Sequence, residues 1–345
     1  MPEKMALRSV EPRLSLADWR HAERLFHVRR EAMVPIREPM VLVSQIQRSG
    51  GTLLNSLLDG HPQLHVHPWE IQVGHPSKSD WPRIDLEAGA DAWLETLSEP
   101  WVPRAFETGY RKDRHGPVAE QSIPVTIVPS FVESLFRVLV SEDPPNSQRA
   151  VLDRYFTAFF NGWLDLQGRS ELPKAWLAGF CPRLAWGESR ARWRTDYPDG
   201  RLVALLRDPR AWYASARSHA PDQRYGDLAR PLAPFVQGGV EIADAKREAP
   251  DQVFVATYER LVAEPEAVMR TLADWLEIDW APSLLEPTFN RSPVPPNSSF
   301  DIPAGGVRQE SLERWRDELD QAQRALIEER DLATYDAVRK LADAA

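Results

Sequence analysis

The fold of this chain is decided by residues 40–62, which read MVLVSQIQRSGGTLLNSLLDGHP. The apolar run at residues 40–43 is typical of a short strand that is buried on both faces of a parallel sheet. Four leucines then recur at helical spacing, and Gly60 followed by Pro62 is typical of a helix end. The segment therefore predicts a strand, a glycine-containing turn and a helix in direct succession.

The turn, Arg48-Ser49-Gly50-Gly51-Thr52, has the physical features of a phosphate-binding loop. Its two glycines let the backbone approach an anion closely, and the N–H groups at the following helix N-terminus point toward that anion. Ser49 and Thr52 bring hydroxyl donors, and Arg48 brings a permanent cation with bidentate reach. The simpler alternative is a tight strand-to-helix turn that is capped by Thr52.

A standard Walker A loop has a lysine directly after its last glycine, and this loop has none. A kinase or an ATPase would therefore lack its γ-phosphate-binding group and the parts that organise Mg²⁺. The loop suits a donor phosphate that is held without a metal, and we expect no metal in the site.

Two further segments repeat the buried-strand pattern, at residues 202–206 and 253–256, and residues 175–178 form a weaker candidate. The two stronger strands lead into helical patterns at residues 210–218 and 265–276. Apolar strands that alternate with helices predict an α/β fold, in which a central parallel sheet is flanked by helices.

A second anion site is indicated at the end of the strand 202–206. Arg207 stands at the strand exit, and Ser215 follows eight positions later in the next helix. Ligands of open α/β sheets bind at this carboxyl edge. The alternative is a surface pair of Arg207 with Asp208, with Ser215 as a filler. Two anion sites at two strand ends favour a ligand with phosphates at both ends.

At these residues the sequence resembles the sulfotransferases that use 3′-phosphoadenosine 5′-phosphosulfate (PAPS). The first loop is similar to the 5′-phosphosulfate loop of this family, and Arg207 with Ser215 is similar to its 3′-phosphate motif. Tyr258-Glu259-Arg260-Leu261 resembles its Tyr-Glu-x-Leu segment. Asn297-Ser298-Ser299-Phe300 and Arg314-Trp315 resemble the C-terminal part of many bacterial members.

The resemblance covers roughly residues 38–62 and 198–320. It implies a P-loop-like fold, PAPS as donor, adenosine 3′,5′-bisphosphate (PAP) as product, and an enzyme that transfers sulfuryl groups. By the resemblance, the loop holds the 5′-phosphosulfate, two residues hold the 3′-phosphate, and a tyrosine lies near the adenine edge. These donor-binding residues are Arg48, Ser49, Gly50, Gly51, Thr52, Leu53, Arg207, Ser215 and Tyr258.

The sequence departs from the family pattern in three places. In the loop, Gly51-Thr52 stands where many members have Thr-Thr. Cytosolic members usually carry a lysine where Arg48 stands, whereas protein-tyrosine and many bacterial members carry an arginine. The Lys-Thr-Pro element that often precedes the 3′-phosphate motif has no clean match, because Phe180-Cys181-Pro182-Arg183 occupies its place. Arg183 or Lys174 are the candidates to supply the missing cation.

The reaction also needs a base, because the acceptor's proton must leave as its oxygen attacks sulfur. Glu70 lies 22 residues after Arg48. Carbohydrate and protein-tyrosine sulfotransferases place a glutamate base at about this spacing, so the resemblance points to Glu70. His67 is the rival, since small-molecule cytosolic members use a histidine. The alternatives are a solvated Glu70 and a His67 that merely caps a turn.

We expect a single domain over residues 1–345, with an acceptor-binding insertion of helical pieces over the active site at 68–170 and a helical C-terminus at 311–345. The Trp, Phe and Pro content of the insertion favours an apolar or aromatic small-molecule acceptor over a highly anionic glycan. A small-molecule kinase with a P-loop and a non-catalytic nucleotide-binding protein stay open as alternatives.

The bulk composition limits partners and location. The net charge of −9 gives no general attraction to nucleic acid or to an anionic membrane, and the single cysteine, Cys181, allows no internal disulfide. We find no apolar run of the roughly 18 residues that a membrane span needs and no signal peptide. A cytoplasmic location is therefore expected, and a homodimer stays open.

Overall fold

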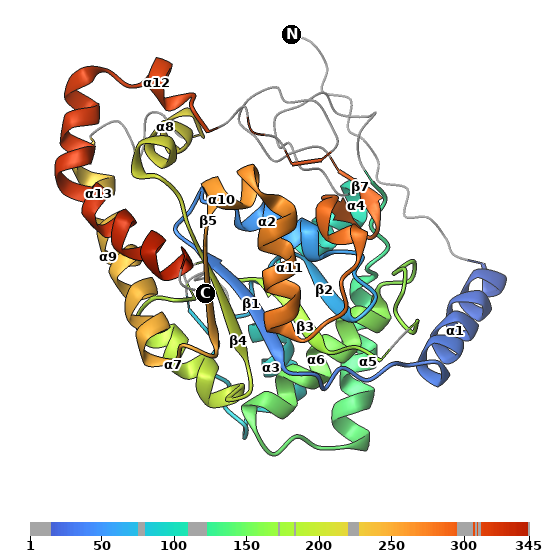
Figure 1. Cartoon of the computed structure of the whole chain (residues 1–345). Coiled ribbons are helices and arrows are strands. Elements are labelled where there is room, and N and C mark those ends of the chain that lie inside the picture. Colours follow the sequence, from blue (N-terminus) through green and yellow to red (C-terminus); the bar gives the residue numbers. More distant parts are fainter. Residues whose placement is uncertain are drawn as a thin grey trace, which may run out of the picture.

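The computed structural model contains a five-stranded sheet with helices on both faces (Figure 1). It describes residues 15–74, 80–109, 123–171, 173–182, 184–219, 228–294, 306–307, 309 and 312–343. The strands are β1 (Met40–Gln45), β2 (Leu64–Glu70), β3 (Trp176–Phe180), β4 (Arg201–Leu206) and β5 (Val253–Thr257). Their spatial order is β2-β3-β1-β4-β5, and every neighbouring pair is parallel, so the predicted α/β class with a central parallel sheet is confirmed.

The central strand β1 carries the loop that the sequence singles out. All six of its residues are buried, because β3 and β4 pair with its two edges and helices cover its two faces. After β1 the chain continues to β2 at one edge of the sheet, and after β4 it continues to β5 at the opposite edge. Such a reversal between adjacent strands opens a crevice at their carboxyl ends, and the two predicted anion motifs both lie there.

Two apolar layers hold the helices to the sheet. Val41 and Val43 face the layer formed with α2 (Gly51–Leu58) and α11 (Pro265–Leu276). Met40 and Leu42 face the opposite layer. The alternation follows from strand geometry, in which successive side chains point to opposite faces. The predicted P-loop-like arrangement of buried strand, glycine turn and helix is therefore confirmed.

The second layer contains the helices that follow β3 and β4 and the C-terminal helices. These are α7 (Gly187–Asp196), α8 (Pro209–His219), α9 (Ala229–Glu248), α12 (Trp315–Glu318) and α13 (Gln321–Asp343). α9 and α13 run side by side and pack against β5 (Figure 1). Helices α12 and α13 lie within the segment for which the sequence predicts a helical C-terminus. The short α10 (Tyr258–Ala263) connects β5 to α11, and η1 (Pro282–Leu285) follows α11.

Among the described residues between β2 and β3, the predicted insertion contains the helices α3 (Ala90–Leu97), α4 (Trp101–Thr108), α5 (Pro129–Glu142) and α6 (Gln148–Gly162). This part of the chain therefore contains helical pieces, as the sequence predicts. One side of α6 faces β2, where Phe159 and Phe160 contact two histidines of that strand.

Strand β2 is absent from the sequence-based prediction. Its residues include two histidines and Pro68, which interrupt the apolar pattern of a buried strand. The structure accommodates the proline through a register shift, because Val66 pairs with Ala178 and Glu70 already pairs with Phe180. Extra residues in one strand remove ladder hydrogen bonds locally, and a proline is tolerated at such an irregularity. Glu70 therefore lies at the carboxyl edge of the sheet.

The first helix, α1 (Leu16–Glu31), begins after Ser15, which forms a capping box with Asp18. None of its residues is buried, and the side chains of Leu16 and Trp19 are exposed. A short hairpin of β6 (Thr288–Phe289) and β7 (Ser292–Pro293) precedes the last helices. Across the described residues, we find no helix whose length and apolar character would let it cross a bilayer.

Candidate active site

The glycine loop is shaped by its contacts with Tyr258 and Phe180. Gly50 has a φ of 95°, and a Cβ atom there would lie 2.5 Å from Cδ2 of Tyr258. A Cβ on Gly51 would lie 2.4 Å from Cε2 of Phe180. Both positions therefore require glycine, the first for its backbone conformation and for space, the second for space alone. Arg48 also adopts the left-handed region, with a φ of 67°.

The two predicted anion motifs meet in space. The Nε atom of Arg48 donates a hydrogen bond to Oγ of Ser215 over 3.4 Å. Nη1 of Arg207 donates to the carbonyl oxygen of Arg48 over 3.3 Å, and the guanidinium of Arg207 lies 4.3 Å from the ring centroid of Tyr258. Four predicted donor-binding residues from β1, β4, β5 and their following helices thus form one cluster at the crevice.

The glycine loop also contains a buried hydroxyl that suits an anion. Ser49 is fully buried, and its Oγ has no hydrogen-bond partner among the described residues. A buried polar atom is normally paired, and one left unpaired invites a ligand or water. Thr52 and Leu53 continue the loop into the first turn of α2, whose backbone N–H groups lack carbonyl partners within the helix. The cationic groups, the hydroxyl and the helix N-terminus together suit a phosphate or sulfate.

Two side chains that the sequence did not reveal as site residues hold the loop. The Oε1 atom of Gln45 accepts a hydrogen bond from the backbone N–H of Gly51 over 2.6 Å. The indole N–H of Trp212 donates to the carbonyl oxygen of Gln47 over 2.7 Å. No local pattern indicates the Trp212 bond, because Trp212 lies 165 positions from its partner.

Glu70 lies half-buried at the end of β2, beside Phe180 in the strand register. Burial raises the pKa of the Cys181 thiol to about 12, and the nearby carboxylates of Glu70 and Glu99 add to that shift. Glu70 is therefore close to the residue that follows β3. Because Phe180 in turn contacts Gly51, the carboxylate stands on the same edge of the sheet as the glycine loop.

His67 has a different environment. It is fully buried, its Nε2 lies 2.9 Å from Oε1 of Glu99, and its Nδ1 lies 3.0 Å from the carbonyl oxygen of Trp69. Its ring stacks on Phe159 at a centroid distance of 4.9 Å. Glu99 also accepts hydrogen bonds from the indole of Trp101. Both ring nitrogens of His67 are engaged inside the core, and this favours Glu70 over His67 as a base.

An aromatic cluster surrounds Trp69, the residue before Glu70. Trp69 is half-buried, and its ring lies 5.1 Å from the ring of Trp101 and 6.4 Å from that of Phe289. Phe289 comes from the hairpin of β6 and β7, and it also contacts Trp163 from the end of α6. The residue that precedes Glu70 in β2 thus packs among aromatic side chains, several of which come from the insertion.

Lys174 and Arg183 are the two candidates for the cation that the Lys-Thr-Pro element would supply. Lys174 precedes β3, at the end of the sheet opposite to the glycine loop, and its ammonium donates to the carbonyl oxygens of Pro62 and Gly168. It does not join the site. Arg183 and the segment Asn297-Ser298-Ser299-Phe300 lie outside the described residues. Within the described part of the chain, no group of three or more His, Cys, Asp or Glu side chains is arranged to hold a metal ion.

A model of the sulfotransferase family matches residues 39–282. No curated protein matches the chain in sequence. Similar solved structures include the sulfotransferase domain of the Synechococcus PCC 7002 olefin synthase, at 17% identity over 90% of this chain and 96% of that one, with a TM-score of 0.48.

Two further structures are a sulfotransferase from Alicyclobacillus acidocaldarius and a mouse sulfotransferase complexed with PAP. The first is 13% identical over 89% of this chain and 97% of that one, with a TM-score of 0.44. The second is 10% identical over 94% of each chain, with a TM-score of 0.40.

Proposed function

Because this chain belongs to the sulfotransferase family, we propose that it transfers a sulfuryl group from PAPS to a hydroxyl group of a small apolar or aromatic acceptor, as an EC 2.8.2 enzyme. The observation that carries the proposal is the meeting of Arg48, Arg207, Ser215 and Tyr258 at the crevice of the sheet. A donor with a phosphosulfate at its 5′ end and a phosphate at its 3′ position needs two adjacent anion sites.

In the proposed complex, Arg48 and the loop from Ser49 to Leu53 hold the 5′-phosphosulfate. Arg207 and Ser215 hold the 3′-phosphate, and Tyr258 lies along the adenine. The buried hydroxyl of Ser49 and the close packing of Gly50 under Tyr258 support this fit. Arginine suits both roles because its fork of N–H groups matches the oxygens of a phosphate or sulfate.

The reaction is an in-line displacement at sulfur. The acceptor oxygen forms a bond to sulfur while the bond between sulfur and the bridging phosphate oxygen breaks. The electron pair of the breaking bond stays on that oxygen, which leaves with PAP, and no atom is oxidised or reduced. Arg48 and the loop amides stabilise the charge that develops there, and one such preorganised contact contributes about 2.7–4 kcal/mol to catalysis.

The acceptor's proton goes to Glu70 in this proposal. Its carboxylate stands at the carboxyl edge of the sheet near Cys181, whereas His67 is held inside the core by Glu99 and Trp69. The aromatic side chains of Trp69 and its neighbours suit an apolar or aromatic acceptor beside that base. The insertion at residues 68–170 would shape most of the acceptor pocket. The single domain, the cytoplasmic location and the homodimer stay predictions.

The direct test is to incubate the purified protein with ³⁵S-labelled PAPS and a panel of phenols, aliphatic alcohols and anionic sugars. We expect labelled sulfate esters of phenols or apolar alcohols, with one PAP released for each ester formed. If the purified protein binds PAP but labels no acceptor, it is a non-catalytic nucleotide-binding protein. A protein that is stabilised by ATP with Mg²⁺ more than by PAP would be a kinase, because a tighter ligand raises the melting temperature more at equal concentration.

A further inference from the structure

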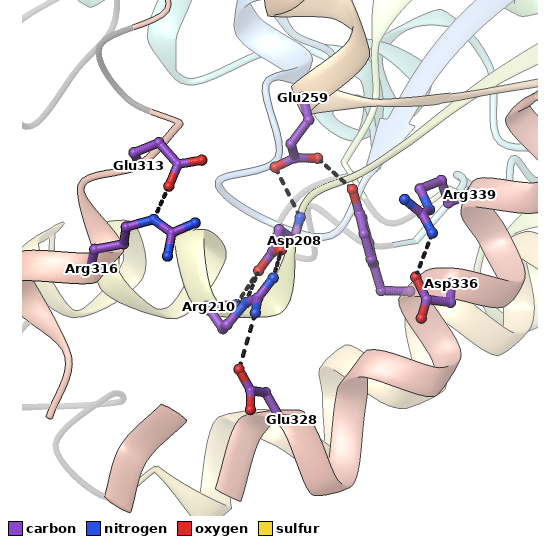
Figure 2. Close-up of polar contacts among 9 residues, drawn as sticks. Asp208, Arg210, Glu259, Glu313, Arg316, Glu328, Asp336 and Arg339 are labelled. Carbon is purple, nitrogen blue, oxygen red and sulfur yellow. Dashed lines mark hydrogen bonds and ion pairs between the residues drawn. The ribbon is translucent and has the colours of Figure 1, made fainter. Parts of the chain in front are cut away.

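The half-buried carboxylate of Glu259 links three parts of the chain that are far apart in sequence (Figure 2). Glu259 lies in the first turn of α10, directly after Tyr258. Its Oε1 accepts a hydrogen bond from the backbone N–H of Asp208 over 3.0 Å, and its Oε2 accepts one from the hydroxyl of Tyr335 over 2.9 Å. One carboxylate thus joins the turn after β4 to helix α13.

The surroundings of Glu259 and Tyr335 shift the pKa of each side chain. Burial raises the pKa of Glu259, and the hydrogen bond from the Asp208 amide is the largest of the contacts that oppose the shift. Burial and the adjacent Glu259 carboxylate raise the pKa of Tyr335, so its hydroxyl keeps its proton and donates. A carboxylate that is partly shielded from water depends on its hydrogen-bond donors, so the loss of one donor is unfavourable. The hydrogen bonds from Asp208 and Tyr335 therefore stabilise the position of the Glu259 carboxylate.

A second connection fixes the same turn from the other side. The carboxylate of Asp208 accepts hydrogen bonds from the backbone N–H of Arg210 over 2.8 Å and from its Nη2 over 2.6 Å. Nη1 of Arg210 then donates to Glu328 of α13 over 3.0 Å (Figure 2). The guanidinium of Arg210 also lies 4.3 Å from the ring of Trp315 in α12. Both the backbone and the side chain of Asp208 are tied to the C-terminal helices.

These ties act on two residues of the candidate donor site. The ladder between β4 and β5 ends at the pair Leu206 and Thr257. Asp208 follows Arg207 directly, and Glu259 follows Tyr258 directly, so the hydrogen bond between Asp208 and Glu259 joins the two chains just beyond that last pair. The Arg207 guanidinium stacks on the Tyr258 ring across that gap. Helices α12 and α13 lie beyond residue 282, where the match to the family model ends.

We propose that Glu259 and Tyr335 are positioning residues, through which α13 holds Arg207 and Tyr258 in the geometry that binds the 3′-phosphate of the donor. The inference rests on the proposed function, because it assigns a 3′-phosphate to Arg207. It extends the donor site to a helix that supplies no group to the donor itself.

The test compares Tyr335→Phe, Glu259→Ala and Glu259→Gln in the full chain. A matched control is Asp336→Asn, which removes a neighbouring carboxylate of α13 that pairs with Arg339 over 3.1 Å and is 40% exposed (Figure 2). Isothermal titration calorimetry gives the PAP affinity, and steady-state kinetics with PAPS give kcat and the acceptor KM.

We expect Tyr335→Phe to weaken PAP binding about three- to tenfold, because one hydrogen bond to a charged group is lost at a distance from the ligand. The value of kcat at saturating PAPS and the acceptor KM stay unchanged. Glu259→Ala weakens PAP binding more. Glu259→Gln restores much of the affinity, since its amide oxygen still accepts from Asp208. Asp336→Asn binds PAP like the wild type. An unchanged PAP affinity in Tyr335→Phe, or an equal loss in Asp336→Asn, overturns the inference.

Hydrogen exchange without nucleotide separates this inference from the proposed function. Because Tyr335→Phe leaves one oxygen of Glu259 without its donor, we expect the amide of Asp208 to exchange faster in that variant than in Asp336→Asn. Wild-type protein that binds no PAP would overturn the proposed function, and the inference about the 3′-phosphate would fall with it. Wild-type protein that binds PAP, with equal PAP affinity in Tyr335→Phe, would overturn the inference alone.

Discussion

The Nε atom of Arg48 lies 3.4 Å from the Oγ atom of Ser215, although the two residues are 167 positions apart. One belongs to the loop after β1, the other to the helix after β4. Their contact brings the two predicted anion motifs together in one crevice. A donor with a 5′-phosphosulfate and a 3′-phosphate would engage both, and each of the following predictions examines a part of that arrangement.

The loop after β1 is expected to reject any side chain at position 50. Gly50→Ala places a methyl group against Tyr258 and strains a φ of 95°, so we predict a loss of PAP affinity of tenfold or more. Gly89→Ala is the matched control, because Gly89 has a φ of 83° and nothing within 4 Å of an added Cβ. Calorimetric titration of both variants separates strain from contact. Equal PAP affinity in Gly50→Ala and Gly89→Ala would refute the close packing.

Glu70 is expected to act in the chemical step and not in donor binding. We predict that Glu70→Gln lowers kcat by about 100-fold or more, the usual contribution of a positioned base, and leaves the PAP affinity within about twofold. Glu23→Gln on the exposed surface of α1 serves as the control. Near-wild-type turnover in Glu70→Gln would show that another group takes the proton.

Cys181 is expected to be unreactive in the folded protein. It is buried, and burial with the nearby carboxylates raises its pKa to about 12, so almost no thiolate forms at neutral pH. A thiol reagent such as 5,5′-dithiobis(2-nitrobenzoic acid) should label less than one tenth of the native protein in an hour and all of it in guanidinium chloride. Rapid labelling of the native protein would place Cys181, and the adjacent Glu70, in a more open environment.

Asp331 is expected to make stability depend on pH. It is fully buried in α13, and neither carboxylate oxygen has a hydrogen-bond partner among the described residues. Burial raises its pKa to about 7, above the roughly 3.9 of an unfolded aspartate. Between about pH 4 and pH 7, Asp331 therefore binds more protons in the folded chain than in the unfolded chain. The stability that Asp331 contributes is full below about pH 4 and is lost as the pH rises through about 7.

Asp331→Asn removes that dependence. We predict that its gain in melting temperature over the wild type is larger at pH 8 than at pH 5, while Asp336→Asn on the exposed side of α13 shows no such difference. Differential scanning fluorimetry at the two pH values measures both variants. Equal gains of Asp331→Asn at pH 5 and pH 8 would contradict the raised pKa.

The sequence predicted the parts of the fold whose cause is local. Residues 40–43 and 202–206 are continuous apolar runs because β1 and β4 are buried on both faces, and the glycine turn marks itself by composition. Strand β2 escaped prediction because His65 and His67 read as polar, whereas the structure packs them against the phenylalanines of α6. Burial of these histidines depends on a helix about 90 residues later.

The candidate site divides in the same way. The motif residues Arg207 and Ser215 were recognisable because spacing along one strand and one helix defines them. The bond between Glu259 and Tyr335 was not recognisable, because the two residues are 76 positions apart and meet only when α13 packs against β5. Gln45 gave no signal either, since a glutamine at a strand end has many ordinary roles.

The central claim is that Arg48, Arg207, Ser215 and Tyr258 form one site for a 3′-phosphorylated donor, and a comparison of PAP with adenosine 5′-monophosphate by calorimetric titration tests it most directly. The two nucleotides differ only in the 3′-phosphate. We predict that the wild type binds PAP about 100-fold more tightly, because two charge-assisted contacts are added, and that Arg207→Ala loses most of this preference while keeping its affinity for the monophosphate. Equal affinity of the wild type for the two nucleotides would contradict the account.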